Sequence, residues 1–142
     1  MNMRKFFVIA AAVCSFGMMA SCAAEKTEIP FGKELTAQEV FNGTEAVKPT
    51  EGFVPTIAFD STRFAGSTGI NRYMGEYTFD SESGAIEFKE PMGMTMMAGP
   101  QEEMDKEQIF VKALNDARFF KMEQDSTYVL MDAENNTLVK FK

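Results

Sequence analysis

The chain has 142 residues, with 14 basic side chains, 21 acidic side chains and a formal net charge of −7. This length suits one domain, since domains peak at roughly 100–150 residues. The sequence contains no histidine, which excludes a Ser-His-Asp triad, a Cys-His dyad and a histidine-ligated metal. The acidic balance argues against nucleic acid as a partner, because phosphate binding needs clustered lysine and arginine.

The first 21 residues have the organisation of a bacterial export signal. Arg4 and Lys5 form a positive start, and residues 6–20 form an uncharged, mostly apolar run. A membrane-spanning helix needs about 20 apolar residues, so this run is short for a span. It ends in Met19–Cys22, which resembles a lipobox, the motif whose cysteine is lipidated. A plain secretory signal, cut after residue 23 or 24, is the alternative.

Lipidation of Cys22 predicts a chain anchored by its N-terminal lipid in the bacterial cell envelope. Lipoprotein sorting rules favour the outer membrane over the inner one, because Ala23 rather than aspartate follows the cysteine. The other cysteine, Cys14, lies in the segment that would be removed, so no internal disulfide is expected. We therefore expect a signal peptide over residues 1–21, a lipidated cysteine and tether over 22–34, and one domain over 35–142.

Short stretches of alternating hydrophobicity follow the tether. They are typical of antiparallel strands with one buried and one solvated face. In chain order, strands are predicted at residues 35–41, 56–60, 63–69, 72–80 and 85–89. The second places Ile57 and Phe59 on one face, and Asn42-Gly43 gives a strong turn signal after the first.

One helix interrupts the strands. Gly99 and Pro100 mark a break, and proline suits a first helical turn. Residues 101–117 then place Met104, Phe110, Leu114 and Ala117 at helical spacing. Three further strands are predicted after the helix, over residues 119–123, 127–132 and 137–141.

Residues 66–77 (GSTGINRYMGEY) carry three glycines among strand residues, at Gly66, Gly69 and Gly75. Glycine inside strands marks bulges, sharp bends or a close backbone approach. Asn71 suits a bend, and its side chain can bind the backbone. This stretch predicts a strongly curved hairpin in a barrel-like sheet. A phosphate-binding loop is the alternative, but Gly-Lys-Ser/Thr is missing and no helix follows.

Gly66, Gly69, Asn71, Gly75 and Tyr77 match the G-x-x-G-C-N-x-x-x-G-x-Y signature of META domains, the HslJ-like heat-shock lipoproteins. Residues 95–98 (TMMA) resemble the family's T-x-M-A step. Met104, Glu107, Phe110 and Leu114 follow its M-x-x-E-x-x-F-x-x-x-L spacing. The resemblance covers about residues 35–142. It implies an α+β, mainly β fold: a curved antiparallel, barrel-like sheet with one packed α-helix. It also implies an envelope protein linked to heat stress and outer-membrane integrity.

Two positions depart from the family pattern. Ile70 and Gly99 stand where the family commonly has cysteines. The joint loss is expected if those cysteines form a bond elsewhere in the family. The resemblance therefore implies no redox role for this chain.

Methionines 92, 94 and 96 give one candidate for metal binding. Their alternation would put three sulfurs on one strand face, and thioethers bind the soft ion Cu(I). Packing of Met92, Met94 and Met96 in the core is the alternative.

Three functions remain open. The first is a non-enzymatic role in envelope stress or integrity, through binding of another envelope protein. The second is inhibition of a co-secreted protease by a loop over residues 90–101, with Glu90, Pro91, Gly99 and Pro100 near its ends. The third is a methionine-rich copper-binding module. We expect no catalytic residue and no cofactor, because nothing in the sequence brings paired carboxylates such as Glu102 and Glu103 into a cleft.

Overall fold

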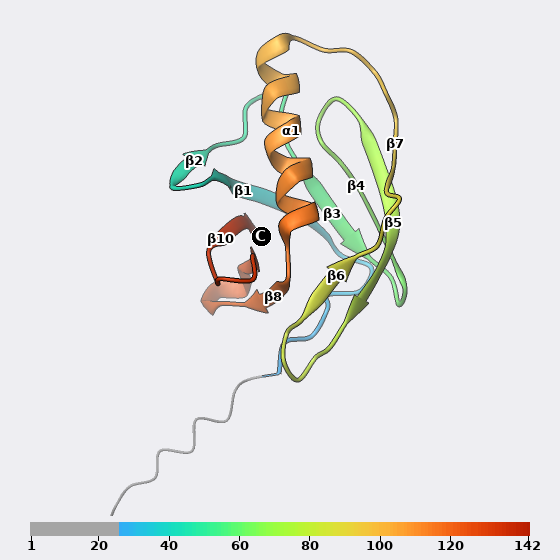
Figure 1. Ribbon diagram of the computed structural model, residues 1–142, viewed down its shortest axis with the longest axis vertical. Helices are drawn as coiled ribbons and strands as arrows, with labels where there is room; N and C mark the ends of the chain where they lie inside the picture. The colour runs from blue at the N-terminus through green and yellow to red at the C-terminus, as the bar shows by residue number, and fades with distance from the viewer. Residues whose placement is uncertain (1–25) are drawn as a thin grey trace, which may run out of the picture.

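The computed structural model describes residues 26–142. The predicted export signal and Cys22 lie outside the described residues, so lipidation stays a prediction. The described strands are β1 (Glu34–Asn42), β2 (Glu45–Val47), β3 (Thr56–Phe59), β4 (Arg63–Ser67), β5 (Arg72–Phe79), β6 (Ile86–Phe88), β7 (Gly93–Met94), β8 (Phe119–Met122), β9 (Tyr128–Met131) and β10 (Thr137–Phe141). The helix α1 (Gln101–Asp116) lies between β7 and β8, and a short 3-10 helix spans Gln124–Ser126 (Figure 1).

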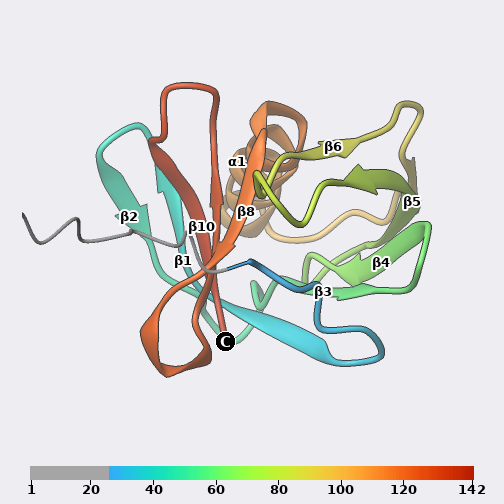
Figure 2. The same cartoon turned by 90° about the horizontal axis from the view of Figure 1, so that it is seen from below.

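The strands form one strongly curved antiparallel sheet. Its order is β6-β5-β4-β3-β1-β10-β9-β8, with β2 added to β1 and β7 added to β5. The two ends of the sheet meet through one bridge between Ala85 and Phe119. Ile86 N donates to Arg118 O at 2.9 Å, and Phe120 N donates to Gly84 O at 2.8 Å. We call the line between these two ends the seam. Figure 2 shows the sheet curving from β6 round to β8, which confirms the predicted mainly β, barrel-like fold.

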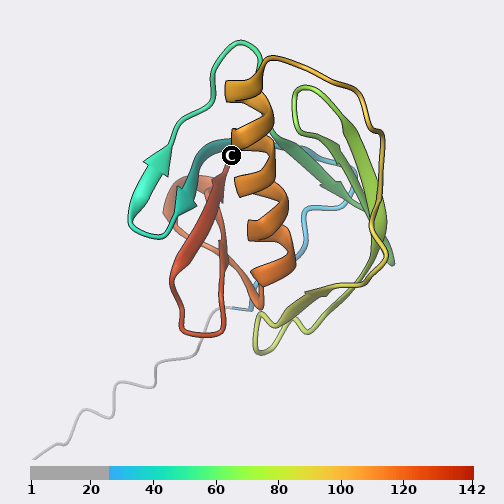
Figure 3. The ribbon, with the colours of Figure 1, turned by 45° about the horizontal axis from the view of Figure 1, so that its top comes forward.

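The helix lies in the concave side of the sheet, between the β1–β10 half and the β4–β5 half (Figure 3). The ring of Phe110 contacts Tyr73 of β5 at 5.7 Å and Phe141 of β10 at 6.4 Å between centroids. An amphipathic helix in a mainly β domain must bury its apolar stripe against the sheet. The predicted helix and its packing are confirmed, but Met104 is only partly buried, and Glu107 is buried beside Phe110 instead.

Aromatic rings join the two halves of the sheet near the seam. Phe59 of β3 lies 5.1 Å from Tyr77 and 5.4 Å from Phe120 between ring centroids. Phe64 lies 4.7 Å from Phe88 of β6. Such ring pairs contribute about 0.5–1.5 kcal/mol each beyond the area that they bury. The core therefore continues across the sheet from β3 to β8.

Part of the segment expected to be a tether lies against the sheet: among residues 26–33, two are buried and most of the others are exposed. Thr27 and Ile29 are each 7% exposed. Phe31 forms a bridge with Phe59, and Gly32 N donates to Phe59 O at 3.1 Å. The sequence is polar here and contains Pro30 and Gly32, but the buried Ile29 and the backbone contacts with Phe59 join the segment to the sheet. The domain starts before residue 35.

The predicted strand positions are confirmed to within about two residues, a typical uncertainty for element ends. No separate strand is predicted for β2, which adds three residues to the edge of β1. The strand expected around the methionines is limited to the two residues of β7. No helix among residues 26–142 is long and apolar enough to cross a membrane.

Candidate functional site

The β4–β5 hairpin carries the glycines of the family motif, and two of them are required by close backbone approach. A Cβ on Gly66 would lie 2.0 Å from the carbonyl oxygen of Thr56 on the neighbouring strand. Gly69 has φ +101°, and a Cβ there would lie 2.7 Å from the carbonyl oxygen of Gly52. Both distances are too short for any side chain larger than hydrogen. The predicted tight, curved hairpin is therefore confirmed.

Asn71 follows the hairpin bend and connects three segments through its buried side chain. Its Oδ1 accepts from Met97 N at 2.7 Å and from Thr95 Oγ1 at 2.9 Å. Its Nδ2 donates to both carboxylate oxygens of Glu107, at 3.1 and 3.0 Å. Thr68 Oγ1 donates to the same carboxylate at 2.5 Å. We call Thr68, Asn71, Thr95, Met97 and Glu107 the motif network.

The motif network uses its polar groups internally. Glu107 is 8% exposed and Asn71 is 3% exposed. A buried carboxylate is costly unless hydrogen bonds satisfy it. Among the described residues, no buried side-chain nitrogen or oxygen lacks a partner. The network therefore stabilises the junction of hairpin, helix and residues 95–97. The predicted backbone binding by Asn71 is confirmed, whereas the burial of Glu107 was not foreseen.

The predicted inhibitory loop over residues 90–101 does not project as one piece. Residues Gly93–Met94 pair with β5 as strand β7, and Thr95 N donates to Arg72 O at 2.9 Å. Glu90 and Pro91 lie at the start of this stretch, and Pro100 is the N-cap of α1. Residues 95–98, here called the 95–98 segment, are the longest exposed run within residues 90–101, with Met96 88% and Met97 63% exposed.

The methionines do not form the common face that their spacing predicted. Met92 and Met94 pack against the hydrophobic core, whereas Met96 is 88% exposed. The alternation of side-chain direction ends because β7 stops at Met94, after which the N–H of Met97 donates to the side chain of Asn71. Among residues 26–142, no group of three or more cysteine or carboxylate side chains is placed to hold a metal ion.

Ile70 and Gly99 touch each other. A Cβ on Gly99 would lie 2.9 Å from Cδ1 of Ile70 and 3.2 Å from its Cγ1. The isoleucine therefore occupies the space that a side chain at position 99 would need. The two positions at which the family resemblance implies cysteines are neighbours in this chain, filled by one large residue and one glycine.

A groove of about 920 Å³ runs between the β5–β6 hairpin and the C-terminal end of α1. We call it the seam groove, because it lies where β6 faces β8 and the end of α1. Phe79, Phe88 and Phe119 supply apolar lining. The charged lining residues are Asp80, Glu87, Glu90 and Arg118.

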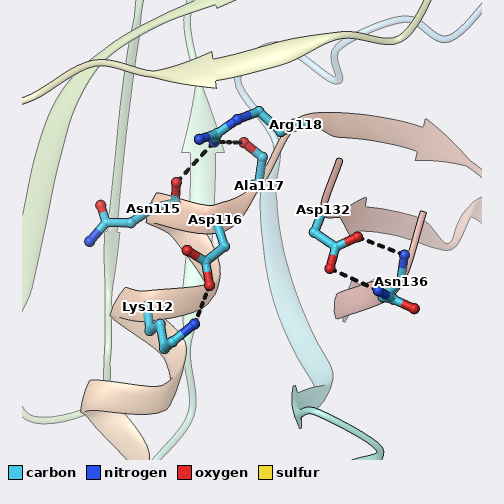
Figure 4. Close-up of polar contacts among 7 residues, drawn as sticks. All are labelled: Lys112, Asn115, Asp116, Ala117, Arg118, Asp132 and Asn136. Carbon is cyan, nitrogen blue, oxygen red and sulfur yellow. Dashed lines mark hydrogen bonds and ion pairs between the residues drawn. The ribbon is translucent and has the colours of Figure 1, made fainter. Parts of the chain in front are cut away.

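The wall formed by the end of α1 is held by short-range contacts (Figure 4). The guanidinium of Arg118 donates through Nη1 to the carbonyl oxygens of Asn115, at 3.0 Å, and of Ala117, at 2.7 Å. These bonds satisfy carbonyls that a helix end leaves without partners. Lys112, one helical turn before Asp116, forms an ion pair with it.

Turns on both sides of the groove carry carboxylates that stay ionised. The backbone N–H of Glu82 and the hydroxyl of Ser83 lower the pKa of Asp80 below its usual value. The side chain and backbone N–H of Asn136 lower the pKa of Asp132 in the same way, through the two bonds drawn in Figure 4. Hydrogen bonds to the charged form favour that form. Of the two, Asp80 lines the groove, and Asp132 lies beside the lining residue Ala133.

A META domain model matches residues 24–142. The chain belongs to the META domain family. This confirms the resemblance that the glycine motif indicated. The match begins before residue 35, in agreement with the burial of Thr27 and Ile29.

Two solved structures are similar to this META domain. An NMR structure of a protein from Burkholderia xenovorans aligns with a TM-score of 0.64 at 18% identity, covering 79% of this chain and 81% of that one. This likeness shows a shared fold. A crystal structure of a DUF4847 family protein from Bacteroides vulgatus aligns with a TM-score of 0.47 at 18% identity, covering 61% and 57%. No curated protein matches the sequence.

Proposed function

We propose that this META domain protein is a non-enzymatic, lipid-anchored component of the bacterial cell envelope that acts by binding another envelope component. Its role would lie in envelope stress or integrity, with the outer membrane as the preferred location. The lipobox-like sequence ending at Cys22 supports anchoring. The seam groove is the observation that carries binding, since it is concave, charged and partly apolar.

The arrangement of polar groups favours binding over catalysis. A reaction centre needs acids, bases or nucleophiles that can reach a substrate. Asn71 and Glu107 of the family motif are instead buried and hydrogen-bonded to each other. The carboxylates of Glu87 and Glu90 in the seam groove belong to exposed residues, which suits recognition of a charged surface.

Anchoring is tested by replacing Cys22 with serine and following palmitate labelling and fractionation in cells. We expect Cys22→Ser to abolish labelling and to leave a full-length precursor that still carries the signal segment. Cys14→Ser is the matched control, since the same change falls in the segment expected to be removed. Normal labelling of Cys22→Ser would contradict the proposal.

The cellular role is tested with a deletion strain. We expect the deletion to increase sensitivity to heat and to detergent, and we expect the unchanged gene to restore growth. Cys22→Ser should not restore it, because a precursor that is neither lipidated nor processed does not reach its partner. A deletion strain that grows normally under both stresses would contradict an envelope role.

Protease inhibition is the second candidate, and one observation favours it. The 95–98 segment is exposed, yet Asn71 binds both the N–H and the C=O of Met97, at 2.7 and 3.2 Å. An inhibitor needs a loop that enters a protease and keeps its shape there, because a rigid loop loses little entropy on binding. The hydrogen bonds of Asn71 supply that rigidity.

Inhibition is tested by incubating the protein with proteases that the same cell exports. We expect a stable complex on gel filtration, and Asn71→Ala should convert the 95–98 segment into a cleaved substrate. Met122→Ala, at another exposed methionine, should behave like the unchanged protein. Rapid cleavage of the unchanged protein without a complex would exclude inhibition of that protease.

A further inference from the structure

Strand β6 is one end of the sheet, and its backbone shows which of its groups face outward. Lys89 N donates to Glu76 O at 2.8 Å, and Asp80 N donates to Ala85 O at 2.9 Å. In an antiparallel pair, alternate residues direct their N–H and C=O groups towards and away from the neighbour. The backbone N–H and C=O groups of residues 85, 87 and 89 therefore point towards β5. Those of Ile86 and Phe88 point towards the seam.

Only part of this outward edge is used. Ile86 N donates to Arg118 O across the seam. The pairing cannot continue towards Phe88, because the residues before Arg118 belong to α1 instead of a strand. Among residues 26–142, the N–H and C=O groups of Phe88 have no hydrogen-bonding partner. Unpaired groups on a sheet edge are a template for another strand.

The side chains of β6 alternate in a way that specifies what could pair with it. Phe88 points to the core, where its ring lies 4.7 Å from that of Phe64, whereas Glu87 is exposed. A strand added beside β6 would follow the same alternation. Every second side chain would meet apolar lining, and those between would lie near Glu87 and Glu90.

The charge of the seam groove favours positive side chains. Asp80, Glu87 and Glu90 face a single lining cation, Arg118, whose Nη1 is already bonded to the carbonyls at the end of α1. The C-terminal end of a helix adds a partial negative charge, and α1 ends at this groove. Acidic strand edges attract basic partners and repel acidic ones.

We propose that the seam groove binds an extended segment of a partner protein in which basic and apolar residues alternate, by adding it as a strand to β6. This inference rests on the proposed binding function and names the chemistry of the partner. The added strand would extend the sheet beyond the Ala85–Phe119 bridge. At that point no strand of residues 26–142 lies beside β6 on the seam side, because the chain before β8 forms α1.

The test uses a fluorescent hexapeptide of alternating lysine and valine, with blocked ends, and the purified protein. We expect saturable binding in fluorescence anisotropy, and changes in the NMR amide signals of residues 85–90 and 115–119. A peptide with alternating glutamate and valine should bind about tenfold more weakly or not at all. A lysine–valine peptide with a central proline should lose affinity similarly, because proline has no N–H to donate.

Protein variants separate local recognition from long-range attraction. Glu87→Lys combined with Glu90→Lys should weaken binding of the lysine–valine peptide by about tenfold or more. Glu45→Lys combined with Glu51→Lys is the matched control, since it changes the net charge equally at exposed residues outside the groove. This control should bind the peptide nearly as well as the unchanged protein.

Several results would overturn the proposal. Equal loss of affinity in both double variants would mean attraction by the overall charge, and equal binding of the proline peptide would exclude strand addition. No binding, or signal changes elsewhere, would also overturn it. A dimer that Glu87→Lys with Glu90→Lys dissociates would assign the edge to a second copy. Failure here leaves the lipid labelling and stress tests of the proposed function unaffected, and their failure leaves peptide binding unaffected.

Discussion

Asn71 and Glu107 face each other inside the domain, with Nδ2 of the asparagine donating to both carboxylate oxygens at 3.1 and 3.0 Å. They lie 36 residues apart in the sequence. Because Asn71 also binds the backbone of Met97, three separate fragments of the META motif form one structural unit. The residues of the motif are therefore the ones that join a hairpin, a loop and a helix by buried hydrogen bonds.

Replacing Glu107 with alanine should destabilise the domain strongly. The change leaves the Asn71 amide and the Thr68 hydroxyl buried without their acceptor, and each orphaned group costs about 1–3 kcal/mol. We expect a loss of about 2–4 kcal/mol in the free energy of unfolding, measured by urea denaturation. Gln108→Ala, next to it on the exposed side of α1, should change this free energy little. Equal effects of the two changes would show that the network does not support the fold.

Gly69 should tolerate a side chain less well than Gly43. Both have positive φ, +101° and +64°, but a Cβ on Gly43 meets nothing within 4 Å. Gly43→Ala should therefore cost only the backbone strain, about 1 kcal/mol. Gly69→Ala adds a collision with the carbonyl of Gly52, and we expect about 2–4 kcal/mol. Thermal unfolding of the two variants compares them, and an equal loss would argue against a tight hairpin.

Cysteines placed at positions 70 and 99 should form a disulfide, because the two positions are already in contact. The chain has no cysteine between residues 26 and 142, so the pair would have no local competitor. The oxidised variant should be about 1–3 kcal/mol more stable than its reduced form. Thiol titration before and after oxidation measures bond formation, and urea denaturation measures the gain.

The single variants control this experiment. Gly99→Cys alone places a sulfur against Ile70 and should destabilise the domain, whereas Ile70→Cys alone removes apolar contacts. In a double-mutant cycle the pair should be more stable than the sum of the single changes predicts. Additive losses with two free thiols would mean that the two segments are farther apart than described.

Alkaline pH should weaken the fold through Tyr73. Burial, together with the charge of Glu34, raises the pKa of Tyr73 well above its ordinary value. The unfolded chain ionises this group at about pH 10, whereas the folded chain holds its proton. Its contribution to stability is therefore complete below about pH 10 and falls as the pH rises above it. Urea denaturation from pH 8 to 11 should show a decline that Tyr73→Phe reduces. An unchanged slope in that variant would contradict the assignment.

Local patterns predicted much of the fold. Alternation located the strands that contain Ile57, Phe59, Tyr73 and Tyr77, because each has a buried face. Helical spacing located α1. The same spacing also contained the signal for Glu107, which lies three residues before Phe110 on the same face. The spacing alone does not show that a charged residue is buried, since the partners that compensate for its burial, Thr68 and Asn71, are distant in the sequence.

The seam groove could not be predicted from the sequence. It depends on the contact of β6 with β8, and on α1 ending at Asp116, two residues before Arg118. No local pattern in residues 85–90 shows which neighbour they will have. Likewise, the exposed Met96 and the packed Met94 differ because Asn71, far away in the sequence, redirects the chain between them.

The central position of β1 determines when the sheet can be completed. β1 pairs with β3 on one side and with β10 on the other, and Thr36 exchanges two backbone hydrogen bonds of 2.9 Å with Lys142. Contacts so distant in sequence form slowly, because a long loop must close first. During synthesis, β1 lacks this partner until residues 137–142 have emerged. A chain that is still being made would therefore stay unfolded around β1 until its last strand is available.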